Sequence, residues 1–222
     1  MHRGERDAIV NGTVRTAFRA GERPGMSRPP LYFVRHGETD WNAEGRLQGQ
    51  RDTPLNPRGF AQAEAVGERL AALLGAGAPE AAYLASPLTR TRQTMETLRR
   101  RLGLAPEAYA TDPRLKELGF GAWEGRTLRE IRVADPRGYA ARNHDRWGHR
   151  PPGEGAESYA MLLARVRPVL DGLDGPTVMV AHGGVARAVL VAGGHASPAE
   201  APHRDIWQGR VLVIDAAGPR WI

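Results

Sequence analysis

The segment Leu31-Tyr32-Phe33-Val34-Arg35-His36-Gly37-Glu38-Thr39 passes abruptly from four apolar residues to polar ones. The apolar residues are aromatic or branched and follow two prolines, which predicts a short strand buried on both faces. The polar residues then lie just past the carboxyl end of that strand, where ligands bind in open α/β sheets. A histidine at this place can reach a substrate, and the arginine before it can hold an anion.

A second segment, Thr177-Val178-Met179-Val180-Ala181-His182-Gly183-Gly184, has the same design. An apolar strand again ends in His-Gly, and we expect a helix over residues 185–192 directly after it. If the two strands are neighbours in a parallel sheet, His36 and His182 meet at one edge of that sheet.

Strands alternate with amphipathic helices along the rest of the chain. Apolar residues at helical spacing predict helices after Asn56-Pro57, after Ser86-Pro87 and from Ser158, and we expect Asn56 and Ser86 to cap the first two. The capping box Thr127-Leu128-Arg129-Glu130 predicts a further helix start. Short apolar runs predict further strands at residues 81–85 and 211–214. The alternation predicts an α/β fold, a three-layer α/β/α sandwich with a mostly parallel central sheet, over residues 29–222 as a single domain.

Residues 1–28 differ from the rest of the chain. They are polar, rich in arginine and glycine, and show no sustained period, and their six arginines against three acidic residues account for half of the net charge of +6. We expect a flexible N-terminal extension, or a natural start of the chain at Met26.

The composition, 41% hydrophobic and 25% charged over 222 residues, is that of an ordinary globular protein. The chain lacks cysteine, so disulfides and thiolate chemistry are excluded. No apolar run approaches the ~18–20 residues that cross a bilayer, and no secretory signal is visible. The arginines are scattered and are not interleaved with aromatic residues, which argues against nucleic acid. We expect a cytoplasmic protein without nucleic acid or membrane partners.

The candidate site combines two histidines with two arginines. Arg90 falls in the first turn of the second helix, where free N–H groups attract anions, although most helix arginines are simply solvated. Arg35 and Arg90 beside His36 and His182 suit a phosphoryl group. A metal is the competing ligand, because histidine binds metals well, but adjacent arginines oppose a cation.

Two further stretches supply candidate residues. The polar loop of residues 38–54 is expected to bind a ligand, and it contains Asn42, Gln48 and Gly49. Glu117 lies among apolar neighbours and before glycines, in a strand end or irregular segment that could bury a carboxyl group.

Several motifs follow one another in order from about residue 31 to the end of the chain. They are Arg35-His36-Gly37-Glu38-Thr39, Trp41-Asn42, Gly45-Arg46, Gln48-Gly49, Asp52-x-Pro54-Leu55, Ser86-Pro87-Leu88-x-Arg90-x-x-Gln93-Thr94, Glu117-x-x-Phe120-Gly121-x-Trp123-Glu124-Gly125 and His182-Gly183-Gly184. Together these motifs resemble the histidine phosphatase superfamily, in its phosphoglycerate mutase-like branch.

This resemblance implies a mechanism. His36 would be the nucleophile that forms a phosphohistidine, and Glu117 would protonate the leaving oxygen and then activate water. The phosphoryl oxygens would be bound by a set that the family pattern supplies: Arg35, Arg90, His182 and Asn42, with Gln48, Gly49 and Gly183 completing the substrate-binding set. No metal and no other cofactor is implied.

The choice between hydrolysis and phosphoryl transfer depends on the segment after the acid. Mutases of the family tend to carry Tyr-Gly and then a lysine-bearing segment, whereas this chain has Phe120-Gly121 and its lysine, Lys116, precedes the acid. We therefore predict a metal-independent phosphomonoester hydrolase that acts on a small phosphorylated metabolite, as a monomer or homodimer. The alternatives are a cofactor-dependent phosphoglycerate mutase and an inactive phosphate-binding module. The latter requires a lost catalytic residue, and none is lost.

Overall fold

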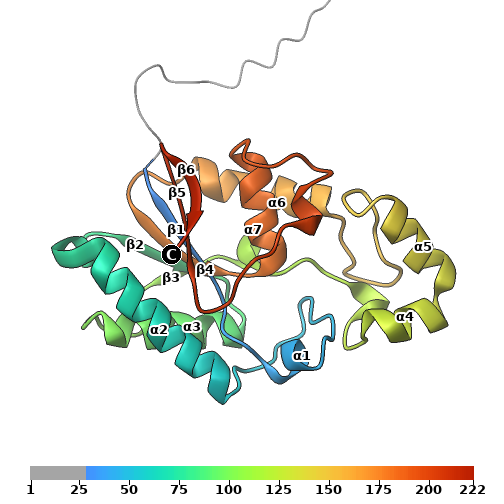
Figure 1. Cartoon of the computed structure of the whole chain (residues 1–222), viewed down its shortest axis with the longest axis horizontal. Helices are drawn as coiled ribbons and strands as arrows, with labels where there is room; N and C mark the ends of the chain where they lie inside the picture. Colours follow the sequence, from blue (N-terminus) through green and yellow to red (C-terminus); the bar gives the residue numbers. More distant parts are fainter. Residues whose placement is uncertain (1–28) are drawn as a thin grey trace, which may run out of the picture.

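The computed structural model describes residues 29–222, so the predicted N-terminal extension and the expected start at Met26 lie outside the described residues. A six-stranded sheet in the order β3-β2-β4-β1-β5-β6 forms the centre (Figure 1). Its strands are β1 (Leu31–Arg35), β2 (Ala82–Ala85), β3 (Ala110–Thr111), β4 (Thr177–Ala181), β5 (Val211–Asp215) and β6 (Gly218–Trp221). Strands β3, β2, β4 and β1 are parallel, and β5 and β6 continue the sheet as an antiparallel hairpin.

Helices cover both faces of this sheet (Figure 1). The α-helices are α1 (Asp40–Ala43), α2 (Pro57–Leu74), α3 (Thr89–Arg101), α4 (Leu128–Ala134), α5 (Pro136–His144), α6 (Tyr159–Asp171) and α7 (Gly183–Ala192). Short 3-10 turns are η1 (Gly75–Gly77), η2 (Pro113–Leu115), η3 (Gly121–Trp123) and η4 (Ala201–His203). No helix among residues 29–222 is long and apolar enough to cross a bilayer.

Two apolar cores lie on the two faces of the sheet. Successive strand residues point to opposite faces, so Phe33 of β1 packs with α6 and α7 while Val34 packs with α2 and α3. All five residues of β4 are buried, as a parallel strand covered on both faces requires. The predicted three-layer α/β/α sandwich with a mostly parallel sheet is therefore confirmed.

The two strands that end in histidine are neighbours, as predicted. Strand β1 pairs with β4 in parallel, with Arg35 opposite Ala181. The pairing continues one residue further, where the His36 N–H donates to the Ala181 carbonyl at 3.0 Å. His36 and His182 thus leave the sheet side by side at the carboxyl ends of adjacent parallel strands.

The predicted helix starts were right in three places and wrong in two. Asn56 caps α2 by accepting from the Gly59 N–H, a capping box opens α4 at Thr127, and α6 begins directly after Ser158. The predicted Ser86-Pro87 cap is wrong, because α3 begins at Thr89 and Leu88 is its N-cap, without a side-chain hydrogen bond. Helix α7 begins at Gly183 rather than at residue 185.

Three elements were not predicted from the sequence. Strand β3 is two residues long, and β6 contains glycine and proline, so neither shows a strand pattern. The loop expected over residues 38–54 contains the single-turn helix α1, which Thr39 opens in a capping box with Asn42.

Candidate active site

His36 is held in one orientation by its own turn. Its side chain is buried, and Nδ1 lies 2.7 Å from the carbonyl oxygen of Gly37. A carbonyl only accepts, so Nδ1 carries the proton and Nε2 of the neutral ring keeps a free electron pair. Gly37 packs closely against α2, since a Cβ on it would overlap the backbone carbonyl of Gly59. A neutral ring with a fixed tautomer and a free Nε2 is what a histidine nucleophile needs.

The two predicted arginines are anchored by backbone carbonyls rather than by carboxylates. Arg35 donates from one terminal nitrogen to the Ile206 carbonyl at 2.9 Å. Arg90 donates to the carbonyls of Gly49 at 2.8 Å and Arg51 at 2.7 Å, and its side chain is fully buried, so the solvated alternative is wrong. The Nε atoms of both arginines are buried and have no partner among the described residues. Unpaired buried donors of this kind favour an anionic ligand.

His182 faces His36 across the edge of the sheet. The two ring centroids are 5.2 Å apart, and His182 Nε2 lies 2.8 Å from the hydroxyl oxygen of Ser86. His182 Nδ1 is buried without a partner in the described part of the chain. A Ser86 hydroxyl that donates to Nε2 leaves the proton of the neutral ring on Nδ1, where it can donate to a phosphoryl oxygen.

Burial and neighbouring charge keep both histidines neutral. The pKa of His36 is lowered well below its ordinary value, first by burial and then by Arg90 and Arg35. The pKa of His182 is lowered in the same way, first by burial and then by Arg90. Burial also lowers the pKa of Arg90, to about 10, which leaves it protonated at neutral pH. The site therefore offers neutral imidazoles beside fixed cations.

Glu117 lies in the irregular segment predicted for it, between η2 and η3, and is half-buried. Its carboxylate accepts from the N–H of Gly184 at 3.0 and 3.1 Å, in the first turn of α7, and from the N–H of Leu118 at 2.8 Å. Burial lowers the pKa of both Arg35 and Arg90, and the Glu117 carboxylate is the charge that most opposes this shift in each. Glu117 thus approaches the paired cations from the side of α7, whereas Arg114 is occupied by Asp112 at 2.6 Å.

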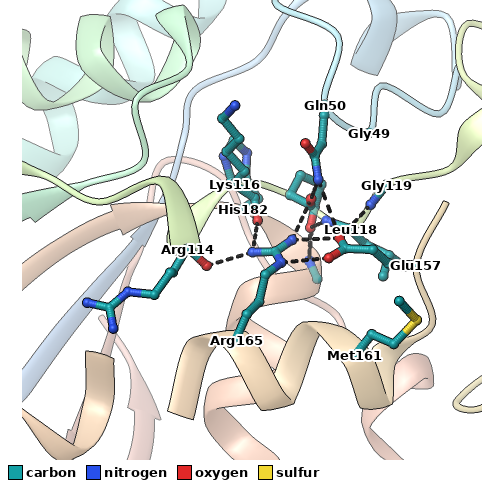
Figure 2. A network of polar contacts seen from close by, with 12 residues as sticks. Gly49, Gln50, Arg114, Lys116, Leu118, Gly119, Glu157, Met161, Arg165 and His182 are labelled. Carbon is teal, nitrogen blue, oxygen red and sulfur yellow. Dashed lines mark hydrogen bonds and ion pairs between the residues drawn. The ribbon is translucent and has the colours of Figure 1, made fainter. Parts of the chain in front are cut away.

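A polar network centred on Arg165 holds the backbone of the segment that contains Glu117 (Figure 2). Arg165 of α6 donates to the carbonyls of Arg114, Lys116 and Glu117 at 2.6, 2.8 and 2.9 Å. The same guanidinium forms two bonds with Glu157, at 2.8 and 2.7 Å. A bidentate Arg–Glu pair of this kind holds both side chains in a defined geometry. Arg165 therefore positions the backbone that carries Glu117 but makes no contact with the Glu117 carboxylate.

The remaining predicted residues surround this centre. Asn42 accepts from Gln208 Nε2 at 3.1 Å, and the same Gln208 nitrogen donates to the His36 carbonyl at 3.1 Å. Gln48 is buried and accepts from the hydroxyl of Thr53. Gly49 adopts φ 54° and packs so closely that a Cβ would overlap Glu124, and its carbonyl holds Arg90. Gly183 lies against Arg35 at the start of α7.

Ser86, Gln208, Arg165 and Glu157 were missed as supporting residues. Ser86 could have been found, because it follows β2, the other neighbour of β4, and so reaches the same edge of the sheet as His182. The other three are recognisable only once the chain is folded, since they come from distant segments. Among the described residues no group of three or more His, Asp or Glu side chains could hold a metal ion.

The buried neutral histidines give a pH dependence of stability. Below about pH 6.5 the unfolded chain binds protons that the folded His36 and His182 do not, so the free energy of unfolding falls as the pH falls, by about 1.4 kcal/mol per pH unit for each ring. Urea unfolding at pH 7, 6 and 5 measures this slope. His36→Gln should lower the slope between pH 6 and 5 by about 1.4 kcal/mol per unit, and an unchanged slope would show that His36 titrates normally.

The sandwich, the paired His-Gly strand ends and the buried arginines define a phosphoryl-binding α/β protein. The family model of the histidine phosphatase superfamily (branch 1) matches residues 31–222, and the chain belongs to this family.

Curated relatives and solved structures support the assignment. The chain is 32% identical to a metal-independent phosphoserine phosphatase of Arabidopsis thaliana, over 86% of this chain and 78% of that protein. It is 36% identical to a probable phosphoglycerate mutase GpmB of Erwinia tasmaniensis, over 78% of each. The native structure of a mycobacterial glucosyl-3-phosphoglycerate phosphatase superposes with a TM-score of 0.70 at 30% identity, over 89% of this chain and 97% of that one.

Proposed function

We propose that this chain is a metal-independent phosphomonoester hydrolase that acts through a phosphohistidine on His36. The observation that carries the proposal is the neutral, oriented ring of His36, with its free Nε2 beside Arg35 and Arg90. Membership of the histidine phosphatase superfamily supports phosphatase activity, and two of the relatives above are named as phosphatases. Small phosphate esters of this kind are found in the cytoplasm, which we propose as the location.

The reaction has two steps with one covalent intermediate. His36 Nε2 attacks phosphorus, the bond from phosphorus to the ester oxygen breaks, and Glu117, which enters this step protonated, gives that oxygen its proton and becomes a carboxylate. Glu117 then takes a proton from water, whose oxygen attacks the phosphohistidine and releases inorganic phosphate. Arg35, Arg90 and His182 bind the phosphoryl oxygens in both steps, where negative charge is concentrated. Asn42, Gln48, Gly49 and Gly183 complete the proposed substrate-binding set.

A phosphoglycerate mutase is the second candidate, because one relative carries that name. Both reactions share the first step and differ in what accepts the phosphoryl group. Phosphate release from a panel of monoesters in the presence of a chelator tests the first function. Conversion of 3- to 2-phosphoglycerate, with and without bisphosphoglycerate, tests the second function.

We expect the chain to release phosphate from simple monoesters in the presence of the chelator and without added bisphosphoglycerate. Efficient isomerisation that depends on the bisphosphate, with little release of phosphate, would reverse this ranking.

A further inference from the structure

The segment between η4 and β5 runs beside the end of β1 and contacts residues of the candidate site. The Ile206 carbonyl accepts from the Arg35 guanidinium at 2.9 Å. Two residues further on, the backbone of Gln208 forms an isolated parallel bridge with Arg35. The side chain of Gln208 therefore starts from a fixed backbone position next to the turn that carries His36.

The side-chain amide of Gln208 uses both hydrogens of its nitrogen within the site. Nε2 lies 3.1 Å from the His36 carbonyl oxygen and 3.1 Å from Asn42 Oδ1. A backbone carbonyl only accepts, so the atom of Gln208 that faces His36 is the nitrogen and not the oxygen. His36 continues the backbone pairing of β1 with β4, so its carbonyl is a fixed acceptor. The bond to this carbonyl directs the second hydrogen of Nε2 toward Asn42.

The Asn42 side chain is held through its oxygen. Oδ1 accepts from the N–H and from the hydroxyl of Thr39, each at 3.2 Å, as well as from Gln208. A backbone N–H only donates, so the oxygen of Asn42 is the atom that faces Thr39. The hydrogen bonds that residues 29–222 make with this side chain all end on Oδ1, and both hydrogens of Nδ2 remain available to a ligand.

The orientation of the Asn42 amide decides its effect on a phosphoryl group. The two ends of an amide have nearly the same shape, so a half-turn exchanges a donor for an acceptor. With Nδ2 outward the side chain donates to a phosphoryl oxygen, whereas with Oδ1 outward it repels that oxygen. The half-turn would also set Nδ2 against Nε2 of Gln208, donor against donor. Thr39 opposes it too, but Thr39 belongs to the same loop as Asn42, whereas Gln208 ties this loop to the end of β1.

We propose that Gln208 is a positioning residue, which holds the Asn42 amide so that Nδ2 faces the phosphoryl group that His36 attacks. The inference rests on the proposed function, in which Asn42 belongs to the substrate-binding set. Gln208 acts through Asn42, because both hydrogens of its own nitrogen are bound to protein oxygens. Since Asn42 acts on the phosphoryl oxygens and not on the leaving group, the contribution of Gln208 is the same for every ester.

A double-mutant cycle for kcat/KM tests the proposal. Gln208→Met keeps the length of the side chain and removes both donors, so kcat/KM should fall by about 10-fold, by the same factor for an alkyl phosphate and for nitrophenyl phosphate. Asn42→Ala should cost about 10²–10³-fold, the scale of one lost donor to a transition-state oxyanion. In the Asn42→Ala background, Gln208→Met should cost less than about twofold, because the side chain that it positions is gone. An equal cost of Gln208→Met in both backgrounds would overturn the proposal.

Gln62 of α2 supplies a matched control. It is half-buried like Gln208, lies against Gly209, and accepts from the Glu38 N–H at 2.8 Å. Gln62→Met therefore removes a hydrogen bond beside the same segment, but not one that ends on Asn42. Its effect on kcat/KM should be the same factor with and without Asn42→Ala. An effect that also vanished in the Asn42→Ala background would contradict a specific role of Gln208.

A measurement on the wild-type chain covers the case in which Gln208→Met does not fold. The side-chain amide resonances of Asn42 and Gln208 are followed by nuclear magnetic resonance while inorganic phosphate is added. The Asn42 resonances should shift strongly, because Nδ2 receives a new acceptor, and those of Gln208 should shift much less, because both of its hydrogens keep their protein acceptors. Asn42 resonances that do not move, or Gln208 resonances that move as far as those of Asn42, would overturn the proposal.

The affinity for inorganic phosphate separates failure of this proposal from failure of the proposed function. Calorimetry repeats the double-mutant cycle on the Kd for phosphate, without any hydrolysis. If the wild-type chain releases no phosphate from esters but Gln208→Met weakens phosphate binding only while Asn42 is present, the function is overturned and the role of Gln208 stands. Hydrolysis by the wild-type chain together with an additive cycle overturns the role of Gln208 alone. No binding of phosphate by the wild-type chain would overturn both.

Discussion

His36→Ala is expected to lower kcat for every phosphate monoester by about 10⁶-fold, the scale found when a hydrolase loses its covalent nucleophile. The reason is that Nε2 of His36 is the free nitrogen of a ring whose other nitrogen donates to Gly37. Among residues 29–222 no other residue at this edge offers the same group, because His182 Nε2 is engaged by Ser86. Steady-state and single-turnover hydrolysis of nitrophenyl phosphate measures the loss.

The phosphate-binding groups provide the control for this variant. Arg35 and Arg90 are held by backbone carbonyls and not by His36, so His36→Ala should bind inorganic phosphate with an affinity close to that of the wild type. Turnover within about 100-fold of the wild type, in a variant that still binds phosphate, would remove His36 from the role of nucleophile.

Glu117→Gln should separate alkyl from aryl esters. General acid catalysis contributes about 10²–10⁴-fold to a rate, so we expect kcat/KM to fall by that factor for an alkyl phosphate, whose alkoxide is a poor leaving group. The nitrophenolate of nitrophenyl phosphate leaves readily without a proton, so hydrolysis of this ester should slow far less. A glutamine can still accept from the N–H groups of Leu118 and Gly184, so the fold of the segment should be kept. The ratio of kcat/KM for the two esters is the measurement.

The neighbouring acids serve as controls for Glu117. Glu38 lies 3.3 Å from Arg58 and accepts from Asn56, while Glu124 accepts from two backbone N–H groups, those of Gln50 and Phe120. Both carboxylates are occupied by structural hydrogen bonds or ion pairs, so Glu38→Gln should change kcat/KM for the two esters by the same factor. Equal losses in Glu117→Gln would take Glu117 out of the proton transfer.

The layers of the fold could be predicted because they follow from local patterns. Strands β1 and β4 are continuous apolar runs, and α2 shows one apolar stripe behind an Asn-Pro start, so their type and order follow from the sequence. Strand β6 of the edge hairpin could not be predicted, because it is half exposed and carries glycine and proline. Its place in the sheet comes from pairing with β5 rather than from its own composition.

The candidate site was predictable to the extent that its residues follow strand ends or helix starts. His36 and His182 follow strands that are recognisable, and parallel pairing brings them together. The network around Arg165 was not predictable, since it joins α6 to an irregular segment through carbonyl groups that carry no sequence signal. The complete burial of Arg90 could not be predicted either, because its partners are backbone oxygens of the loop before α2.

Trapping the phosphorylated protein tests the central claim most directly. The wild-type chain is mixed with nitrophenyl phosphate in the presence of a chelator, and the reaction is quenched in alkali to preserve phosphohistidine. The protein is then digested, and mass spectrometry locates the phosphoryl group. The easy leaving group makes the intermediate accumulate before water attacks. We predict one phosphoryl group on His36, formed within the first turnover and lost as phosphate is released. A phosphoryl group on His182 or on any other residue, with His36 unmodified, would contradict the account.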